Sequence, residues 1–416
     1  MKKTKLALAI TTAVFASSAL ATNGDNMIGT GAHEIAMGGT GVTGIHGAEG
    51  VLINPASIGG IQGTEFNIGG TLFMPTIKNE TPTSPAGTDE LTSAGDTYII
   101  PSVSTATRIN ENLTFGLGMW GTSGMGVDYS KETGGTAGSL KASSNLQILK
   151  FAPSLTYNKD NFAIGFAPVL QYGALDIDHD QTAFSGFGSP NKGVGTGASS
   201  DLGWGYMIGG TYKTGNLVLG ASYDSAIDMK YDGQISTQLD SFSWLGVSAF
   251  TNDHLEQPAQ IKVGASYLMG NITLSADFKQ IRWSEAKGYK QFGWEDQNVI
   301  ALGAKYDTDK FWIGAGYNRG DTPVDEQDAA AAGQAGIDNS AKNFFNLTFF
   351  PATSEQHFTL GGGYKLNNNL SVDLAVAYSP ETEETFKTTS LAGGAFGDVT
   401  TKHSELSYTA QMSYKF

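Results

Sequence analysis

The last ten residues of the chain alternate strictly between apolar and polar side chains. They read SYTAQMSYKF, and the apolar face carries Tyr408, Ala410, Met412, Tyr414 and Phe416. The opposite face carries Ser407, Thr409, Gln411, Ser413 and Lys415. A β-strand places successive side chains on opposite faces, so this pattern suits a wall with lipid on one side and water on the other.

The same two-residue period, bounded by turn residues, predicts about 14 strands along the chain. An even number of strands is typical of single-chain bacterial barrels. The predicted strands are Thr64–Met74, Thr97–Ile109, Asn112–Gly121, Asn145–Asn158, Asn161–Ile177, Asp201–Lys213, Asn216–Tyr231, Pro258–Met269, Asn271–Trp283, Asp296–Asp307, Lys310–Arg319, Gln356–Leu366, Asn369–Ser379 and Ser404–Phe416.

The connections between these strands are alternately short and long. Short turns are predicted at 110–111, 159–160, 214–215, 270, 308–309 and 367–368. Long connections begin near Pro75, Thr122, Asp178, Asp232, Ser284, Gly320 and Pro380. Outer-membrane barrels have short periplasmic turns and long outer loops. The fold class predicted from the pattern is therefore all-β, a transmembrane antiparallel β-barrel of about 14 strands.

Residues 1–21 have the pattern of a secretory signal peptide. Lys2, Lys3 and Lys5 precede an apolar run, and Ala19-Leu20-Ala21 supplies the small residues of a cleavage site, so we expect cleavage after Ala21. Residues 22–62 show no sustained alternation. Their apolar side chains would be exposed in a free tail, which favours a small hatch that plugs the lumen. Residues 63–416 are predicted to form the barrel and its long extracellular loops.

The amino-acid composition excludes several classes of function. The chain has no Cys, which excludes a thiolate nucleophile and a cysteine metal site. It has 40 acidic and 25 basic residues, a net charge of −15, which becomes −18 without the three lysines of the signal peptide. A nucleic-acid partner is not expected, because phosphate binding needs a basic patch.

Four segments resemble the FadL/TodX family of outer-membrane transporters for long-chain fatty acids and aromatic hydrocarbons. Asn54-Pro55-Ala56 resembles the N-terminal NPA motif of that family, and Pro258–Trp283 is similar to its Pro…GxxY…W strand pair. Trp294–Val324 and Phe349–Tyr378 look like the segments that follow. The resemblance implies a 14-stranded barrel with an N-terminal hatch, passive ligand-gated diffusion without a cofactor, and sideways exit through a kink in the third strand.

The resemblance directs attention to three sets of residues. The first set consists of apolar side chains in the third and fourth outer loops. They would either form a groove that holds the ligand or simply pack the loops onto the barrel rim. They are Phe184, Phe187, Leu239, Phe242, Trp244, Leu245, Val247 and Phe250. Lys150 and Lys262 fall on the lumen face, where they would pair with acids or meet a ligand carboxylate. The hatch and gate candidates are Asn54, Pro55, Ala56, Gly116, Gly118 and Gly121, the glycines fitting either a kink or ordinary strand.

Other chemistry has little support in the sequence. Asp176, Asp178 and Asp180 begin like a calcium loop, but Gln181 stands where glycine is needed. The histidines form no H-x-x-x-H pair and no G-x-S-x-G motif is present. Prolines at Pro101, Pro153 and Pro168 predict bulges or local breaks in the strand ladders.

We therefore expect a transporter, not an enzyme, in the outer membrane of a Gram-negative bacterium, with no metal or other cofactor. The expected partners are hydrophobic small molecules, outer-membrane lipid and lipopolysaccharide, and the barrel-assembly machinery, since the C-terminal strand ends in Phe. The chain is expected to be a monomer. The alternatives are a porin for small polar solutes, an outer-membrane lipid enzyme and a surface adhesin or receptor.

Overall fold

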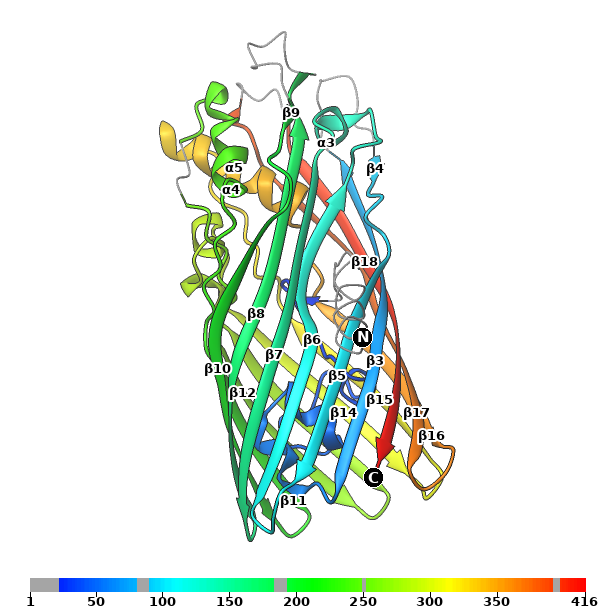
Figure 1. The fold of residues 1–416 in the computed structure, drawn as a ribbon. Helices are drawn as coiled ribbons and strands as arrows, with labels where there is room; N and C mark the ends of the chain where they lie inside the picture. Colours follow the sequence, from blue (N-terminus) through cyan, green and yellow to red (C-terminus); the bar gives the residue numbers. More distant parts are fainter. Residues whose placement is uncertain (1–21, 81–89, 183–192, 249–251, 392–396) are drawn as a thin grey trace, which may run out of the picture.

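The computed structural model describes residues 22–80, 90–182, 193–248, 252–391 and 397–416. Within these ranges, 14 long strands form the wall of a closed antiparallel barrel, as the alternation predicted (Figure 1). The wall strands are β3 (Thr64–Glu80), β5 (Tyr98–Arg108), β6 (Leu113–Asp128), β7 (Ser143–Lys159), β8 (Phe162–Asp180), β10 (Ser199–Thr214), β11 (Leu217–Asp224), β12 (Gln260–Met269), β13 (Ile272–Ile281), β14 (Gln297–Asp307), β15 (Phe311–Gly320), β16 (Gln356–Lys365), β17 (Leu370–Phe386) and β18 (Val399–Lys415).

The barrel closes where the first wall strand meets the last. β3 and β18 pair antiparallel from Glu65–Lys415 to Glu80–Thr400. The side chains follow the predicted alternation: on β13, Leu274 is 44% exposed on the outside, whereas Ser275 is 6% exposed on the inside. The outer surface is therefore apolar and the inner surface largely polar, as a barrel in a bilayer requires.

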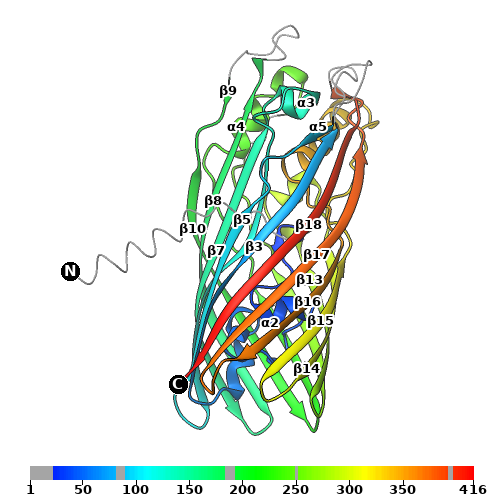
Figure 2. The same ribbon diagram turned by 90° about the vertical axis from the view of Figure 1, so that its right-hand side faces the viewer.

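Short turns lie at one end of the barrel, together with the C-terminus, and the long connections lie at the other end (Figures 1 and 2). The outer end carries the short elements β4 (Glu90–Thr92), α3 (Gly135–Ser139), β9 (Gly193–Val194), α4 (Ile235–Asp240), η4 (Ser243–Leu245), η5 (Trp283–Glu285), η6 (Tyr289–Phe292) and α5 (Gln334–Phe349). None of the helices in the described residues is both long and apolar enough to cross a bilayer.

Several predicted strand ends were wrong. β3 continues to Glu80, β6 to Asp128 and β17 to Phe386, each at least six residues beyond the predicted end. In contrast, β11 ends at Asp224, and only isolated bridges such as Ile227–Gln257 continue its hairpin.

The fifth predicted strand also ended too early, because Asp178 and Asp180, which were placed in the connection after it, lie on β8. Asp176, Asp178 and Asp180 lie on β8, on the same face as the exposed Phe162 and Ile164. Residues between them, such as Ile177, are buried. The outward face of β8 therefore changes from apolar to acidic toward its outer end, which indicates that this end projects beyond the bilayer.

Residues 22–62 lie inside the barrel, toward the end with the short turns (Figures 1 and 2). They form β1 (Thr22–Asn23), β2 (Asn26–Met27), α2 (Ala32–Ala36), η1 (Gly47–Leu52) and η2 (Pro55–Gly60). α2 packs against β16 and β17, and η2 packs against β7, β8 and β10. Val51 and Ile58 are fully buried in this position. We call residues 22–62 the N-terminal segment.

Two of the prolines that were expected to interrupt the strand ladders face each other across a break in the wall. The β7–β8 ladder has register pairs at Phe151–Leu170 and Leu155–Phe166 but none between them, where Pro153 and Pro168 lie opposite each other. Proline has no backbone N–H to donate. The register is unchanged on both sides, so this is a local break and not a bulge.

Candidate functional site

The outer loops form an aromatic cluster against α5. The ring of Phe242 stacks on His179 with centroids 4.9 Å apart and meets Phe345 edge-on at 5.5 Å. Phe345 in turn stacks on Phe349 at 4.9 Å. Such ring pairs contribute about 0.5–1.5 kcal/mol each beyond the area that they bury. The fourth outer loop is therefore held firmly on the helix of the sixth.

A small cavity lies beside this cluster. Its volume is about 150 Å³, and Leu239 and Val247 of the fourth loop line it together with Phe292 of the fifth loop and Ala341 of α5. Asp338 and Lys342 provide charged side chains at the same cavity. The cavity thus joins three outer loops, and its lining is apolar on the side of the fourth loop.

The predicted groove residues have different positions. Leu239 and Val247 line the cavity, Phe242 is buried in the aromatic cluster, and Trp244 and Leu245 are half-buried nearby. Phe184, Phe187 and Phe250 lie outside the described residues. Among the described members of the set, some side chains therefore pack the loops together, whereas others line a cavity.

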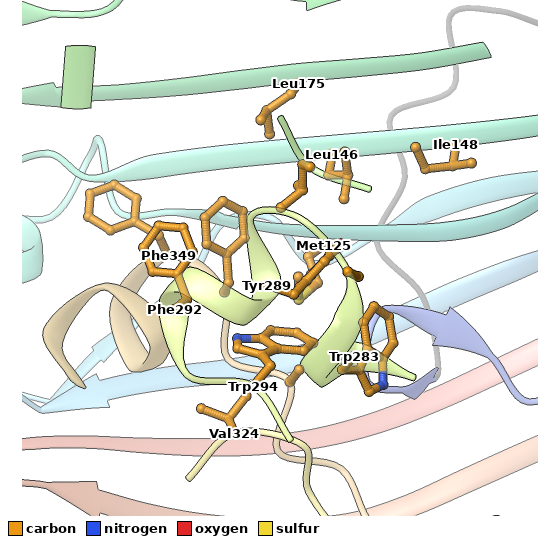
Figure 3. Close-up of a cluster of buried hydrophobic side chains, with 14 of the residues drawn as sticks. Met125, Leu146, Ile148, Leu175, Trp283, Tyr289, Phe292, Trp294, Val324 and Phe349 are labelled. Carbon is orange, nitrogen blue, oxygen red and sulfur yellow. The ribbon is translucent and has the colours of Figure 1, made fainter. Parts of the chain in front are cut away.

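A second aromatic group lies below the loops, at the level where the lumen begins. Trp283, Tyr289 and Trp294 of the fifth loop are each at most 2% exposed, and their ring centroids are 4.7–5.1 Å apart. Figure 3 shows them among Met125 of β6 and Leu146 of β7, which belong to the same buried cluster. Apolar side chains thus continue from the outer loops to the inner face of the wall.

The N-terminal segment touches this aromatic group directly. A side chain at Gly24 would bring its Cβ within 2.6 Å of the Trp283 ring, so only glycine fits there. The hydroxyl of Tyr289 donates a hydrogen bond to the Asp25 carboxylate, and Gln257 Nε2 donates to the same oxygen at 3.0 Å. Burial, together with the charge of Asp25, raises the pKa of Tyr289 well above its usual value, which keeps its hydroxyl a donor.

The wall is incompletely paired next to Asp25. Among the described residues, the ladder between β5 and β6 runs from Arg108–Thr114 to Ser102–Trp120 and stops there. The β6–β7 ladder has a bulge between Gly121 and Ser123 at the same level. Contacts resume at the outer end, where Ala94 N donates to Asp128 O at 2.8 Å. We call the stretch of β6 between these points, Gly121–Val127, the β5–β6 break.

The N-terminal segment fills this break. Asn26 pairs with Ser123 as a neighbouring strand would, and Gly124 N donates to Asp25 O at 3.1 Å. Ser123 Oγ also donates to Asp25 O, at 2.9 Å. Every residue of the break is buried. The break is therefore closed in this structure, and residues 25–26 occupy the position that β5 leaves empty.

The three candidate glycines of β6 have different surroundings. A Cβ at Gly116 would lie 2.6 Å from Val51, and one at Gly118 would lie 2.5 Å from Leu52, so both allow the N-terminal segment to approach the wall. Gly121 lies at the bulge, beside Ile100 of β5. Only Gly121 is thus placed at the irregular part of the strand.

An inner cavity lies against the break. Its volume is about 60 Å³, and its lining includes Trp120 and Thr122 of β6 with Lys150 of β7 and Lys262 of β12. Lys262 pairs with Asp224 at 2.8 Å and donates to Ile53 O at 3.0 Å. Lys150 is 9% exposed, and among the described residues no acidic group lies within 4.0 Å of its amine. The two lysines therefore differ, since Lys262 has an ion-pair partner and Lys150 lines the cavity without an acid within that distance.

The comparisons with known proteins agree with this geometry. A model of the family described as outer membrane protein transport protein (OMPP1/FadL/TodX) matches residues 7–416. The chain belongs to this family. It is therefore an outer-membrane transport protein of Gram-negative bacteria and not an enzyme.

Relatives of this FadL/TodX-family chain share its length and fold at low identity. The 47 kDa outer membrane protein of Pasteurella multocida (strain Pm70) is 22% identical over 393 residues, which are 88% of this chain and 87% of that protein. The toluene transporter TodX of P. putida is 19% identical, with a TM-score of 0.67 over 93% of this chain and 99% of TodX. A FadL homologue of Pseudomonas aeruginosa is 17% identical, with a TM-score of 0.70 over 94% and 100% of the two chains.

The Asn54-Pro55-Ala56 motif of this family member fixes the N-terminal segment to the wall. Asn54 accepts a hydrogen bond from Ala56 N at 2.9 Å and donates to Val42 O at 2.7 Å, which caps η2. Thr156 of β7 donates to Pro55 O at 2.5 Å. The motif lies at η2, where the segment packs on β7, β8 and β10, and away from the β5–β6 break.

Sequence reasoning missed Asp25, Tyr289 and the aromatic residues of α5. A run of aromatic residues in the sixth loop, Phe344, Phe345, Phe349 and Phe350, was a readable signal for buried packing there. Asp25 gave no such signal, because single acidic residues in polar segments are common and usually exposed to solvent. Within the part of the chain that the structure describes, no three His, Asp or Glu side chains gather as metal ligands, Asp176, Asp178 and Asp180 included.

Proposed function

We propose that this chain carries a hydrophobic compound across the outer leaflet by passive, ligand-gated diffusion and releases it sideways through the barrel wall. The observation that carries the proposal is the β5–β6 break, which adjoins the inner cavity and is filled by residues 25–26 of the N-terminal segment. A water-filled pore does not require an interruption in its wall. A solute that prefers lipid to water could leave the lumen through such an interruption.

Capture would begin at the outer cavity between the fourth, fifth and sixth loops. Leu239 and Val247 offer apolar surface there, and transfer of apolar groups from water gains about 0.8 kcal/mol per CH₂. The aromatic group of Trp283, Tyr289 and Trp294 continues the apolar surface inward. A compound that moves along these side chains avoids water between the surface and the lumen.

The N-terminal segment would act as the hatch. It occupies the lumen, is fixed to the wall at Asn54-Pro55-Ala56 and closes the break at Asp25 and Asn26. Its link to the outer loops through Tyr289 supplies a route by which a ligand near the aromatic group would release it. The gate would then be residues 25–26, and Gly121 its flexible neighbour on β6.

The substrate class that this site favours is a long-chain fatty acid or a similar amphiphile. Lys150 lines the inner cavity with Trp120 and Thr122, and no described acid lies within 4.0 Å of its amine. A carboxylate headgroup would pair with it while the chain lies on apolar surface. TodX is a toluene transporter, and an aromatic hydrocarbon has no carboxylate to pair with Lys150.

The charged lining of the inner cavity favours a second candidate, a channel for small polar solutes. Asp224, Asp277, Lys262 and Lys279 all contribute to that lining. For either function we propose that processing after Ala21 precedes insertion, that the assembly machinery reads the C-terminal strand, and that the barrel works as a monomer surrounded by lipid and lipopolysaccharide.

Uptake in cells that lack their own hydrophobe transporter tests the proposal. Cells expressing the chain would receive radiolabelled oleate or toluene, and the Trp244→Ala variant would test the outer loops. Trp204→Ala is the matched control, because Trp204 is 71% exposed on the outer face of β10. We expect saturable oleate uptake that Trp244→Ala weakens and Trp204→Ala does not. No uptake of either compound, with leakage of small sugars in liposomes, would establish the polar channel instead.

A further inference from the structure

A buried carboxylate on the last strand holds the start of the N-terminal segment. Glu405 of β18 is 2% exposed, and its Oε2 accepts hydrogen bonds from Thr22 N at 3.2 Å and from His357 Nε2 at 2.9 Å. The Thr22 hydroxyl also donates to Glu405, at 3.4 Å. His403 Nε2 lies 3.3 Å from its Oε1, and among the described residues no Lys or Arg amine lies within 4.0 Å, so the nearest basic groups are two imidazoles. A buried carboxylate normally needs a positive partner.

The residue that meets Glu405 is the one at which the mature chain is expected to begin. Residues 19–21 read Ala-Leu-Ala, the pattern of a cleavage site, and Thr22 follows. Hydrolysis of the Ala21–Thr22 bond adds water, leaving a carboxylate on Ala21 and an amine on Thr22. An α-amino group has an ordinary pKa of about 7.7–8.0, so it carries a proton near neutral pH.

We propose that Glu405 is the binding site for the α-ammonium group that cleavage creates at Thr22. Cleavage would replace an amide N–H by an ammonium at an atom that already donates to the carboxylate. The hydrogen bond from a neutral amide to the carboxylate then becomes an ion pair between two opposite charges. The buried carboxylate of Glu405, which otherwise contacts two imidazoles, gains an ammonium partner from the processed chain itself.

The new terminus would lie among packed neighbours. Thr22 is 2% exposed and Asn23 is fully buried. Thr22 and Asn23 pair with Met27 and Asn26 in a tight hairpin. Asn26 in turn fills the β5–β6 break. Docking of the new terminus therefore positions the residues that close the wall, whatever compound the barrel carries.

Periodate provides a direct probe of this terminus. It cleaves the Cα–Cβ bond of a threonine only where the amine and hydroxyl of that residue are both free, giving an aldehyde on the protein, acetaldehyde and ammonia, while periodate is reduced to iodate. The folded barrel would be purified from outer membranes of cells that express the full precursor. Intact mass would identify the first residue, and capture of the aldehyde by an aminooxy dye would give the reaction rate.

We expect a first residue of Thr22 and a rate at least about tenfold slower in the folded barrel than in the unfolded chain. Glu405→Gln should raise the folded rate toward the unfolded one, and Glu405→Asp should give an intermediate value. Glu384→Gln, which removes a half-buried carboxylate at the outer end of β17, is the matched control and should leave the rate unchanged. If the N-terminal segment were held by packing alone, the reaction rate would not depend on the charge of Glu405.

Three results would overturn the proposal. The first is a mature chain that begins at another residue. The second is a folded wild-type barrel that reacts as fast as the unfolded chain, a comparison that needs no variant to fold. The third is a folded Glu405→Gln barrel with the wild-type rate.

Discussion

The backbone carbonyl oxygen of Asp25 accepts a hydrogen bond from the backbone nitrogen of Gly124 at 3.1 Å. The side chain of the same Asp25 accepts a hydrogen bond from Tyr289 of the fifth outer loop. One residue of the N-terminal segment thus contacts both the outer loops and the β5–β6 break. A change at the loops can reach the wall through a single residue, with no need for the barrel itself to deform.

Tyr289→Phe removes the donor on the loop side of this connection. It leaves the buried Asp25 carboxylate with one donor fewer, at a cost of about 1–3 kcal/mol to the closed state. A more populated open state lowers the ligand concentration needed for half-maximal uptake, and we expect a drop of about tenfold. Tyr129→Phe is the control, because Tyr129 is equally buried but its hydroxyl has no partner among the described residues. An equal drop in both variants would refute the connection.

Ser123→Ala removes a donor on the wall side. Its hydroxyl donates to Asp25 O at 2.9 Å, and a typical hydrogen bond of this kind contributes about 0.5–1.5 kcal/mol net. We expect faster leakage of a small hydrophobic dye through liposomes that contain the variant. Ser154→Ala serves as the control, since Ser154 is buried on β7 with no described partner for its hydroxyl. Unchanged leakage in Ser123→Ala would mean that Asp25 does not hold the break closed.

Lys150→Met tests the headgroup assigned to the substrate. Methionine keeps the length of the side chain and removes its charge, so we expect the half-saturating oleate concentration to rise about tenfold, equivalent to about 1.4 kcal/mol. Toluene uptake, if any, should not change. Lys305→Met is the matched control, because Lys305 is a lumen lysine that already pairs with Asp307 at 3.2 Å. Equal losses for oleate in both lysine variants would show a general effect of lumen charge.

The outer loops should loosen in acid. Asp228 of the fourth loop pairs with His254 Nδ1 at 2.7 Å and with Lys287 Nζ of the fifth loop at 2.5 Å. Partial burial raises the pKa of Asp228, but the hydrogen bonds from Lys287 and His254 outweigh it, and the net pKa is lowered. The stabilisation is therefore complete above the ordinary pKa of about 3.9 and is lost as pH falls through the lower folded value.

Limited proteolysis by an acid-active protease measures this loosening. Cleavage in the fourth loop should accelerate below about pH 4 in the wild type. Asp228→Asn cannot lose the charge on acidification, so it should be cleaved faster than wild type at neutral pH and show a flatter profile. Identical pH profiles for the two proteins would contradict the role of Asp228.

The wall strands could be predicted because lipid and water impose opposite demands on alternate residues. β13 obeys this rule from Ile272 to Lys279 and β18 from Leu406 to Tyr414, and the turns between strands carry the expected residues. The outer half of β6 could not be predicted. Residues 120–127 are all buried, because the N-terminal segment and the loops cover them, and without an exposed face the alternation disappears.

The site was less predictable than the wall because its residues meet across the whole chain. Asp25 and Tyr289 are 264 residues apart in sequence, and neither lies in a motif. Leu239 and Val247 were recognised because apolar residues in an outer loop are unusual, yet their partners on α5 follow a helical arrangement that strand alternation does not detect. Glu405 lies on a strand that was predicted correctly, but its contact with Thr22 required the fold.

A reversible lock across the edge of the β5–β6 break tests the central claim most directly. The Cβ of Ile100 lies 3.8 Å from the position of a Cβ at Gly121, the usual separation in a disulfide, and the chain has no other cysteine. Oleate uptake would be measured in cells expressing the Ile100→Cys/Gly121→Cys double variant, after oxidation and again after reduction, with each single variant as a control. The account predicts that oxidation abolishes uptake in the double variant alone and that reduction restores it. Full uptake by the oxidised, cross-linked barrel would contradict exit through the wall at this point.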